Sequence, residues 1–208
     1  MQLYHMQGAC SLADLIVLNW LDVPHDMVSM SMDTLKSPAY LAINPNGSVP
    51  LLVHGNYTLT ENTAILGYLA DLHPQAQLAG DGSARGRAEV MRWLGFLNSD
   101  VHKAFKPLFS PARFLDERDF DEELARLARH HVRIYLDRID AQLAGRAWLT
   151  GQRSVADPYL FVVLRWAATK EVDLRGLDNL AAFTARMLAD PGVCLALADD
   201  ESAAEAAL

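Results

Sequence analysis

The sequence predicts an α/β domain with a small mixed sheet, followed by an all-helical bundle domain. The first third alternates short segments of period-two and helical hydrophobicity, whereas apolar residues farther along recur only at helical spacing. A turn-rich run at 79–83 separates the two patterns. The 208 residues are 51% hydrophobic, which is enough for a substantial core. We therefore expect an α/β domain over 1–76, a linker over 77–84 and a helical domain over 85–208.

The α/β part opens with a strand at Leu3–His5. A helix follows, and Ser11 with Asp14 three residues later is typical of a capping box at its start. Alternation predicts a second strand at Val28–Met32, and a short helical or irregular stretch over 37–43 comes next.

A β-hairpin is predicted in the next segment, because Leu51–His54 and Tyr57–Thr60 flank the tight-turn pair Gly55-Asn56. A helix over 62–72 completes the order β-α-β-α-β-β-α. This order corresponds to a mixed sheet with helices on its faces.

Four helices are expected in the second half, followed by a frayed or short exposed helical tail. Each is marked by apolar residues at helical spacing, and Gly145 closes the second. Their expected ranges are 85–109, 124–143, 154–170 and 177–189.

The charge balance argues against nucleic acid or an anionic membrane as a partner. Lys and Arg number 18 against 26 Asp and Glu, for a net charge of −8. The N-terminus lacks the basic start and apolar core of a signal peptide, and charged residues interrupt every apolar run. A cytoplasmic location is therefore expected.

The two cysteines, Cys10 and Cys194, are far apart and match no metal-ligand spacing, and the seven histidines do not cluster. We expect no metal site and assign Cys194 to packing. So few cysteines suit a reducing cytoplasm.

Cys10 is the strongest candidate for chemistry. It directly precedes a predicted helix, where free N–H groups and the helix dipole stabilise an anion. This placement predicts a lowered thiol pKa and a nucleophilic thiolate. A small buried hydrophobic cysteine is the alternative.

Seven segments resemble the glutathione transferase family, particularly its bacterial Cys-containing beta class, in order and spacing. They are Gly8–Leu12, Asn44–Pro50, Leu59–Ile65, Tyr68–Asp71, Trp93–Leu94, Val101–Lys103 and Ser154–Leu160. The resemblance implies a thioredoxin-like N-terminal domain packed on an all-helical C-terminal domain, a homodimer, and glutathione as co-substrate.

The resemblance also assigns a glutathione subsite. A cis Val49-Pro50 bond would free the Val49 backbone to pair with the cysteinyl part of glutathione. Glu61 and Asn62, at the start of a helix, would hold its γ-glutamyl end. An ordinary trans turn and simple helix capping are the alternatives.

The helical domain supplies the remaining candidates. The family counterpart of His102 faces the thiol, where an imidazole would hydrogen-bond to sulfur or lower its pKa. Phe105, Phe109 and Trp166 are candidates for the wall that receives an apolar co-substrate, although aromatics at this spacing are also typical of a core.

Two reactions follow from the resemblance. In the first, glutathione thiolate attacks a small apolar electrophile, which is detoxification chemistry. In the second, Cys10 forms a mixed disulfide with glutathione, and because Ala13 stands where a resolving thiol would be, free glutathione must resolve it. Other classes use a Ser or Tyr hydroxyl, so Ser11 ranks second and Tyr4 third as the activating group.

Other functions stay open from the sequence. A non-catalytic ligand-binding or regulatory protein on the same fold is the main rival, since fold alone does not establish activity. A glutathione-dependent isomerase or dehalogenase would share the glutathione subsite.

Overall fold

The computed structural model describes residues 1–114 and 118–206, and its N-terminal part forms a four-stranded mixed sheet. The strands lie in the order β2-β1-β3-β4. β1 pairs parallel with β2, and β3 pairs antiparallel with both β1 and β4. Their bounds are β1 Gln2–His5, β2 Asp26–Ser29, β3 Leu51–His54 and β4 Tyr57–Thr60. The predicted hairpin is confirmed, whereas β2 lies earlier in the chain than expected.

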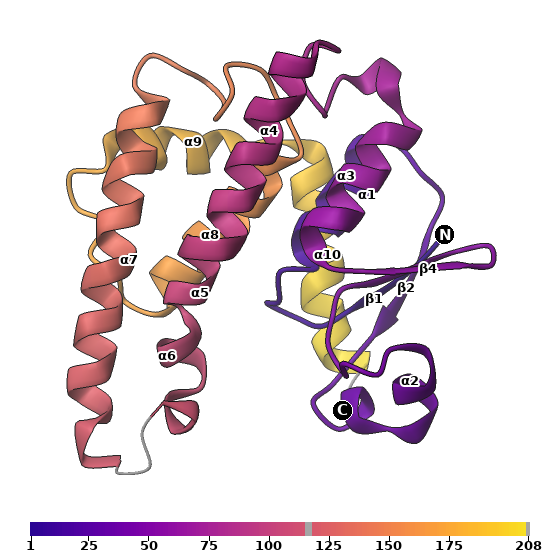
Figure 1. Cartoon of the computed structure of the whole chain (residues 1–208), viewed down its shortest axis with the longest axis horizontal. Coiled ribbons are helices and arrows are strands. Elements are labelled where there is room, and N and C mark those ends of the chain that lie inside the picture. The colour runs from indigo at the N-terminus through magenta and orange to yellow at the C-terminus, as the bar shows by residue number, and fades with distance from the viewer. Residues whose placement is uncertain (115–117, 207–208) are drawn as a thin grey trace.

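Helices cover both faces of this sheet (Figure 1). α1 (Leu12–Trp20) and α3 (Asn62–Leu72) pack on the face that carries Leu3 and Leu52. α2 (Pro38–Ile43), capped by the Ser37 hydroxyl, covers the other face. Residues 12–18 of α1 are all buried, because α1 lies between the sheet and the helices of the second half.

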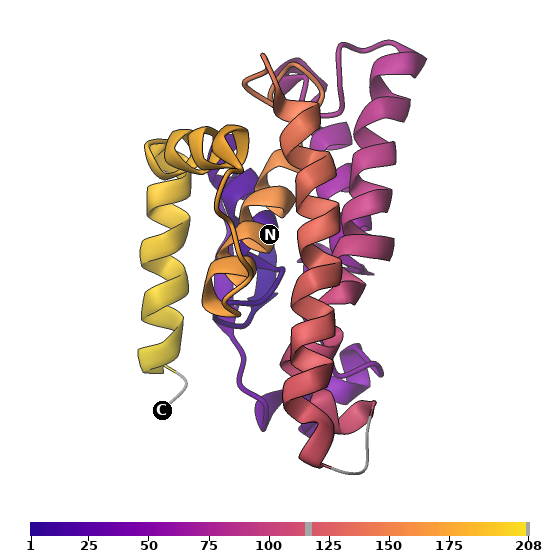
Figure 2. The same ribbon diagram turned by 90° about the vertical axis from the view of Figure 1, so that its left-hand side faces the viewer.

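The second half of the described chain is helical (Figures 1 and 2). Its α-helices are α4 Ala84–Phe96, α5 His102–Ala104, α6 Lys106–Phe109, α7 Asp121–Leu143, α8 Ala156–Thr169, α9 Asp178–Leu188 and α10 Pro191–Ala206. Short 3-10 turns lie at Thr34–Lys36, Pro74–Ala76, Pro111–Arg113 and Arg118–Phe120.

The single helix predicted over 85–109 is interrupted. A π-helical turn at Leu97–Val101 joins α4 to α5, and the helix is interrupted at Phe105 before α6 begins. Pro107 has no N–H to continue the helical hydrogen bonds across this break. The sequence prediction missed the interruption because the apolar spacing continues through it.

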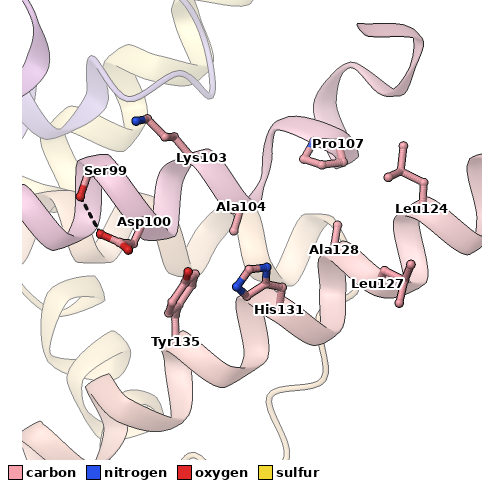
Figure 3. A pocket seen from close by; sticks show the side chains of 10 residues that line it. All are labelled: Ser99, Asp100, Lys103, Ala104, Pro107, Leu124, Leu127, Ala128, His131 and Tyr135. Atoms are coloured by element: carbon pink, nitrogen blue, oxygen red, sulfur yellow. Dashed lines mark hydrogen bonds between the residues drawn. The ribbon is translucent and has the colours of Figure 1, made fainter. Parts of the chain in front are cut away.

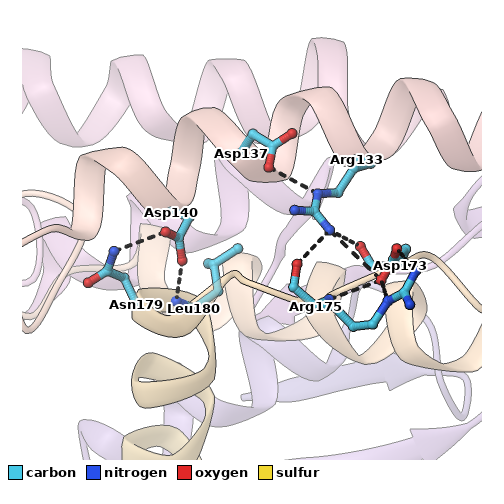
Figure 4. Close-up of polar contacts among 7 residues, drawn as sticks. All are labelled: Arg133, Asp137, Asp140, Asp173, Arg175, Asn179 and Leu180. Carbon is cyan, nitrogen blue, oxygen red and sulfur yellow. Dashed lines mark hydrogen bonds and ion pairs between the residues drawn. The ribbon is translucent and has the colours of Figure 1, made fainter.

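α7 is tied to the connection between α8 and α9 (Figure 4). Nη1 of Arg133 donates to the carbonyl oxygens of Asp173 and Arg175 at 2.6 and 3.0 Å. The Asp140 carboxylate accepts from the Leu180 N–H at 2.9 Å, at the start of α9. These contacts hold α7 against the rest of the helical bundle.

The tail from Asp199 onward, expected to be frayed or a short exposed helix, instead continues α10 as far as Ala206. α10 packs along α1 (Figure 1) and forms the left edge of the molecule in Figure 2. The Trp20 indole N–H donates to Asp190 at 2.8 Å, and Asp200 is buried with 1% of its surface exposed. Cys194 is exposed on this helix, so its assignment to packing was wrong.

One continuous apolar core extends from the sheet through α1 and α3 into α4, α7, α8, α9 and α10. Within the described ranges, no single helix is long and apolar enough to cross a membrane; α9 and α10, bent by 80°, meet that test only as a pair. In the same residues no cluster of three His, Cys, Asp or Glu side chains has a metal-binding arrangement.

Candidate functional site

Three segments meet at one end of the sheet. β1 ends there and leads into the loop that carries Cys10. Tyr4 pairs with Leu51, and Leu51 pairs in turn with Thr60, so Val49-Pro50 and Glu61 lie at this same end. The strand register thus brings together the thiol and the subsite residues that the sequence predicted.

Cys10 lies at the N-terminus of α1, as predicted, but its pKa is shifted in the opposite direction. Cys10 is half-buried, and the loss of contact with water raises its thiol pKa to about 12. The negative charges of Asp14 and Glu61 add to this rise. The hydrogen bonds of the Cys10 and Ser11 backbone N–H groups lower the pKa by less. The prediction of a resting thiolate was therefore wrong: without a ligand, Cys10 is protonated at neutral pH.

The capping box predicted at Ser11 and Asp14 is also wrong. The Ser11 hydroxyl makes no cap hydrogen bond and lies 2.9 Å from Nδ1 of His5 instead. Asp14 is fully buried, and burial raises its carboxyl pKa well above the usual value. Ser11 is also completely buried, so its hydroxyl is not available to contact a substrate.

Tyr4, the third-ranked activating group, faces α2. Its ring centroid lies 5.4 Å from that of Tyr40, within the small cluster between the sheet and α2.

The Val49-Pro50 bond is cis, as predicted. Glu61, the N-cap residue of α3, is exposed and has a φ of 71°, an uncommon value for a residue with a side chain. Such backbone conformations are concentrated at ligand sites. The exposed carboxylate and the N-terminus of α3 lie together at this position.

Asn62 does not present its amide to a ligand. It is buried, and with its amide nitrogen turned toward Asp14 it donates to the two carboxyl oxygens at 3.0 and 3.2 Å. The buried carboxyl of Asp14 needs such donors. The predicted side-chain contact from Asn62 to glutathione is therefore corrected to a structural role, and the backbone at the helix start is unaffected.

His102 is hydrogen-bonded to the opposite helix. Its Nδ1 lies 2.7 Å from the hydroxyl of Tyr159 on α8, and that hydroxyl donates to Asn98 at 3.0 Å. Burial and the nearby charge of Lys106 lower the His102 pKa to about 4. The imidazole is neutral at pH 7, so it cannot lower the thiol pKa through a positive charge.

Tyr159, the hydrogen-bond partner of His102, is a residue to which the sequence prediction gave no role. Burial raises the pKa of its hydroxyl, and the negative charges of Cys10, Asp14 and Glu61, when these groups are ionised, raise it further. Tyr159 precedes Trp166 by seven residues, two helical turns, so both lie on one face of α8. That spacing is the signal the sequence offered.

The three predicted wall residues lie together, but they differ in exposure. The Trp166 ring lies 5.7 Å from that of Phe105 and 5.4 Å from that of Phe109. Phe105 is completely buried, Trp166 is 7% exposed and Phe109 is 42% exposed. Phe105 is therefore a core residue, and Phe109 is the member of the cluster with the largest exposed surface.

A separate cavity of about 380 Å³ lies between α5 and α7 (Figure 3). Lys103, His131 and Tyr135 are among the side chains that line it. His102 instead contacts α8, so this cavity is distinct from the Cys10 site.

Comparison with known proteins agrees with this geometry. Residues 3–77 match the family model for the glutathione S-transferase N-terminal domain, and residues 97–191 match that for the C-terminal domain. A Xanthomonas campestris protein named glutathione S-transferase GST-4.5 is 50% identical over 198 residues, covering 95% of this chain and 97% of its own.

Solved structures are similar over the same extent. A glutathione S-transferase from Xylella fastidiosa superposes with a TM-score of 0.93 at 46% identity, over 96% of this chain and 98% of its own. A sphingomonad glutathione S-transferase complexed with glutathione gives 0.86 at 37%, over 97% and 99%. A beta-class enzyme from Sphingomonas chungbukensis gives 0.85 at 37%, over 96% and 98%. With its cis-proline, Cys10 loop and helical second half in this common arrangement, the chain belongs to the glutathione S-transferase family.

Proposed function

We propose that this protein is a glutathione transferase that conjugates the glutathione thiolate to small apolar electrophiles. The observation that carries the proposal is the convergence of Cys10, cis Val49-Pro50 and Glu61 at one end of the sheet. Glutathione needs three kinds of partner: a backbone edge, a group for its γ-glutamyl end and a donor for its sulfur. These three segments supply one each.

Glutathione is the co-substrate, and the subsite residues divide its binding. The backbone of Val49 pairs with the cysteinyl part, as an added strand would. Glu61 takes the γ-glutamyl end, where its carboxylate suits the α-amino group and the N-terminus of α3 suits the α-carboxylate.

Conjugation is favoured over mixed-disulfide chemistry by the protonation of Cys10. Attack on a disulfide requires a thiolate, and the Cys10 pKa of about 12 leaves little of it at neutral pH. A protonated thiol instead donates a hydrogen bond to the sulfur of bound glutathione and stabilises that thiolate. His102 and Tyr159 are joined by a hydrogen bond, and because His102 is neutral they add no positive charge to this side of the site.

The first test is calorimetric titration of the reduced protein with glutathione. We expect one site per chain, and Glu61→Ala should weaken binding by roughly tenfold, the effect of losing one charge-assisted hydrogen bond. The matched control is Glu171→Ala, which removes the same charge from an exposed position where Glu171 pairs with Arg129 of α7. No saturable binding at millimolar glutathione would reject the proposal and favour a non-catalytic binding or regulatory role.

A second test separates the two reactions. Conjugation of a chloronitrobenzene is expected to persist in Cys10→Ser, whose hydroxyl still donates, and to fall in Cys10→Ala. Cys194→Ser serves as the control and should behave as the unaltered protein. If Cys10→Ser loses all turnover, and if the unaltered protein reduces mixed disulfides rapidly, Cys10 is a nucleophile and the redox reaction is the function.

The remaining expectations from the resemblance belong to the same proposal. The protein acts as a cytoplasmic homodimer in detoxification, with domains at 1–76 and 85–208. Light scattering should give twice the chain mass of 23.0 kDa. A mass equal to that of one chain at working concentrations would reject the dimer.

A further inference from the structure

Two groups of the helical half hold the loop that carries Cys10. The Gly8 carbonyl oxygen accepts from the Trp166 indole N–H at 2.7 Å. The Gly8 N–H donates to the Asp200 carboxylate at 2.9 Å. Gly8 has a φ of 70°, a conformation that glycine adopts at little cost. One peptide segment, two residues before the thiol, is therefore bound by both α8 and α10.

The same Asp200 oxygen also lies 2.9 Å from Nε2 of His5. His5 ends β1 and is completely buried, and its Nδ1 lies 2.9 Å from the Ser11 hydroxyl. Because the carboxylate accepts at Nε2, a neutral imidazole carries its proton there and leaves Nδ1 to accept from Ser11. The series Asp200–His5–Ser11 thus reaches the residue that follows Cys10.

The Asp200 carboxylate is buried and surrounded by polar partners. Asp200 is 1% exposed, although it lies on the terminal helix next to the exposed Glu201. Its second carboxylate oxygen lies 3.7 Å from Nη2 of Arg165 on α8. A buried carboxylate persists only when it is paired and hydrogen-bonded. Here the hydrogen bonds come from His5 and Gly8, and the paired charge comes from Arg165.

We propose that Asp200 is a positioning residue for Cys10, which holds the loop through Gly8 on one side of the thiol and through His5 and Ser11 on the other. We call Asp200, His5, Ser11 and Gly8 the Asp200 clamp. The clamp keeps the thiol half-buried at the start of α1, and docking of α10 thereby sets the reactivity of Cys10. This inference rests on the proposed role of Cys10 in the site.

The test is the rate of Cys10 alkylation by iodoacetamide, followed by mass spectrometry of its peptide. Asp200→Ala leaves the His5 and Gly8 donors without an acceptor and releases the loop. The thiol becomes more exposed and its pKa falls, so Cys10 should react faster by roughly fivefold or more, the factor expected for losing one buried hydrogen bond. The exposed Cys194 in the same chain is the internal control and should keep its rate.

Two variants make the result specific. Asp200→Asn keeps a carbonyl oxygen that accepts from both His5 and Gly8, so it should restore a rate close to that of the unaltered protein. Asp199→Ala removes a neighbouring carboxylate that points in a different direction on the helix, and it should leave Cys10 unchanged.

If Asp200→Ala fails to fold, Trp166→Phe tests the other side of the loop. It keeps an aromatic ring but removes the N–H that donates to the Gly8 carbonyl, and Cys10 should again react faster. An unchanged Cys10 rate in a folded variant, or an equal acceleration at Cys194, would overturn the proposal. Alkylation needs no glutathione, so the clamp and the proposed function can fail separately.

Discussion

The charges around Cys10 all act against its ionisation. Asp14 and Glu61 are acidic, and the imidazole of His102, which contacts Tyr159 and Trp166 on α8, is held neutral by burial. A helix N-terminus alone was expected to lower the thiol pKa, but burial and the two carboxyls outweigh it. The site is therefore suited to a thiol that donates a hydrogen bond.

Asp14→Asn tests this balance directly. Removing the carboxyl next to the thiol is expected to lower the Cys10 pKa, because one of the charges that oppose the thiolate is lost. The thiolate ultraviolet absorbance, measured against pH in a Cys194→Ser background, gives the value. Asp22→Asn, at an exposed position just beyond the C-terminal end of α1, is the control. A rise in pKa, or no change, would contradict the electrostatic account.

His102→Gln makes a prediction about stability. In the folded protein the His102 pKa is about 4, below its usual value of 6.5. The unfolded chain therefore binds an extra proton between these two values, and stability is lost as the pH falls through this window. The variant lacks the titrating group, so its free energy of unfolding should fall less than that of the unaltered protein from pH 7 to pH 4. Urea titrations at the two pH values measure the difference, and equal losses would refute it.

At the scale of elements, local patterns were read correctly where the local chain decides the structure. The Gly55-Asn56 hairpin follows from turn chemistry, and Gly145, with a φ of 70°, lies just beyond the end of α7. A distant partner contributes to the failure at Ser11. The Ser11 hydroxyl pairs with His5 instead of capping α1. The other ring nitrogen of His5 forms a hydrogen bond with the carboxylate of Asp200, 195 residues away. No local pattern contains such a contact.

The segment between the sheet and α4 depends on Gly80. Its φ is 105°, and a Cβ there would lie 2.6 Å from the backbone carbon of Gly86 in α4. Gly82 has a similar φ of 83°, but a Cβ there would meet nothing within 4 Å. The pair therefore separates backbone strain from close contact.

Gly80→Ala should accordingly cost more stability than Gly82→Ala. The left-handed conformation costs an alanine about 1–2 kcal/mol, which is the loss expected at Gly82. The collision with α4 should add about 1–3 kcal/mol at Gly80. Chemical denaturation of both variants measures the two losses, and equal losses would show that α4 moves away freely.

At the scale of the molecule, α1 belongs to both halves of the chain. It packs against the sheet and α3 on one side and against α8 and α10 on the other. The sequence pattern correctly predicted an α/β part and a helical part. It could not show that α10 docks on α1, because the apolar residues of 191–198 specify burial without naming a partner.

This shared core predicts that the two halves unfold together. Hydrogen exchange of β3 and of α8, followed by mass spectrometry across a urea titration, should lose protection at one common midpoint. Leu160→Ala on α8, where Leu160 is completely buried, should lower both midpoints in parallel through a loss of about 2–5 kcal/mol. Leu188→Ala, at a residue 49% exposed, is the matched control and should move neither by much.

The same reasoning extends to the isolated α/β part. A chain of residues 1–84 would expose the side of α1 that α8 and α10 cover, so we expect it to lack cooperative unfolding. If β3 stays protected at urea concentrations where α8 has lost all protection, the α/β part is stable by itself. The apolar contacts of α1 with α8 and α10 would then serve to place the thiol of Cys10, and not to hold the fold together.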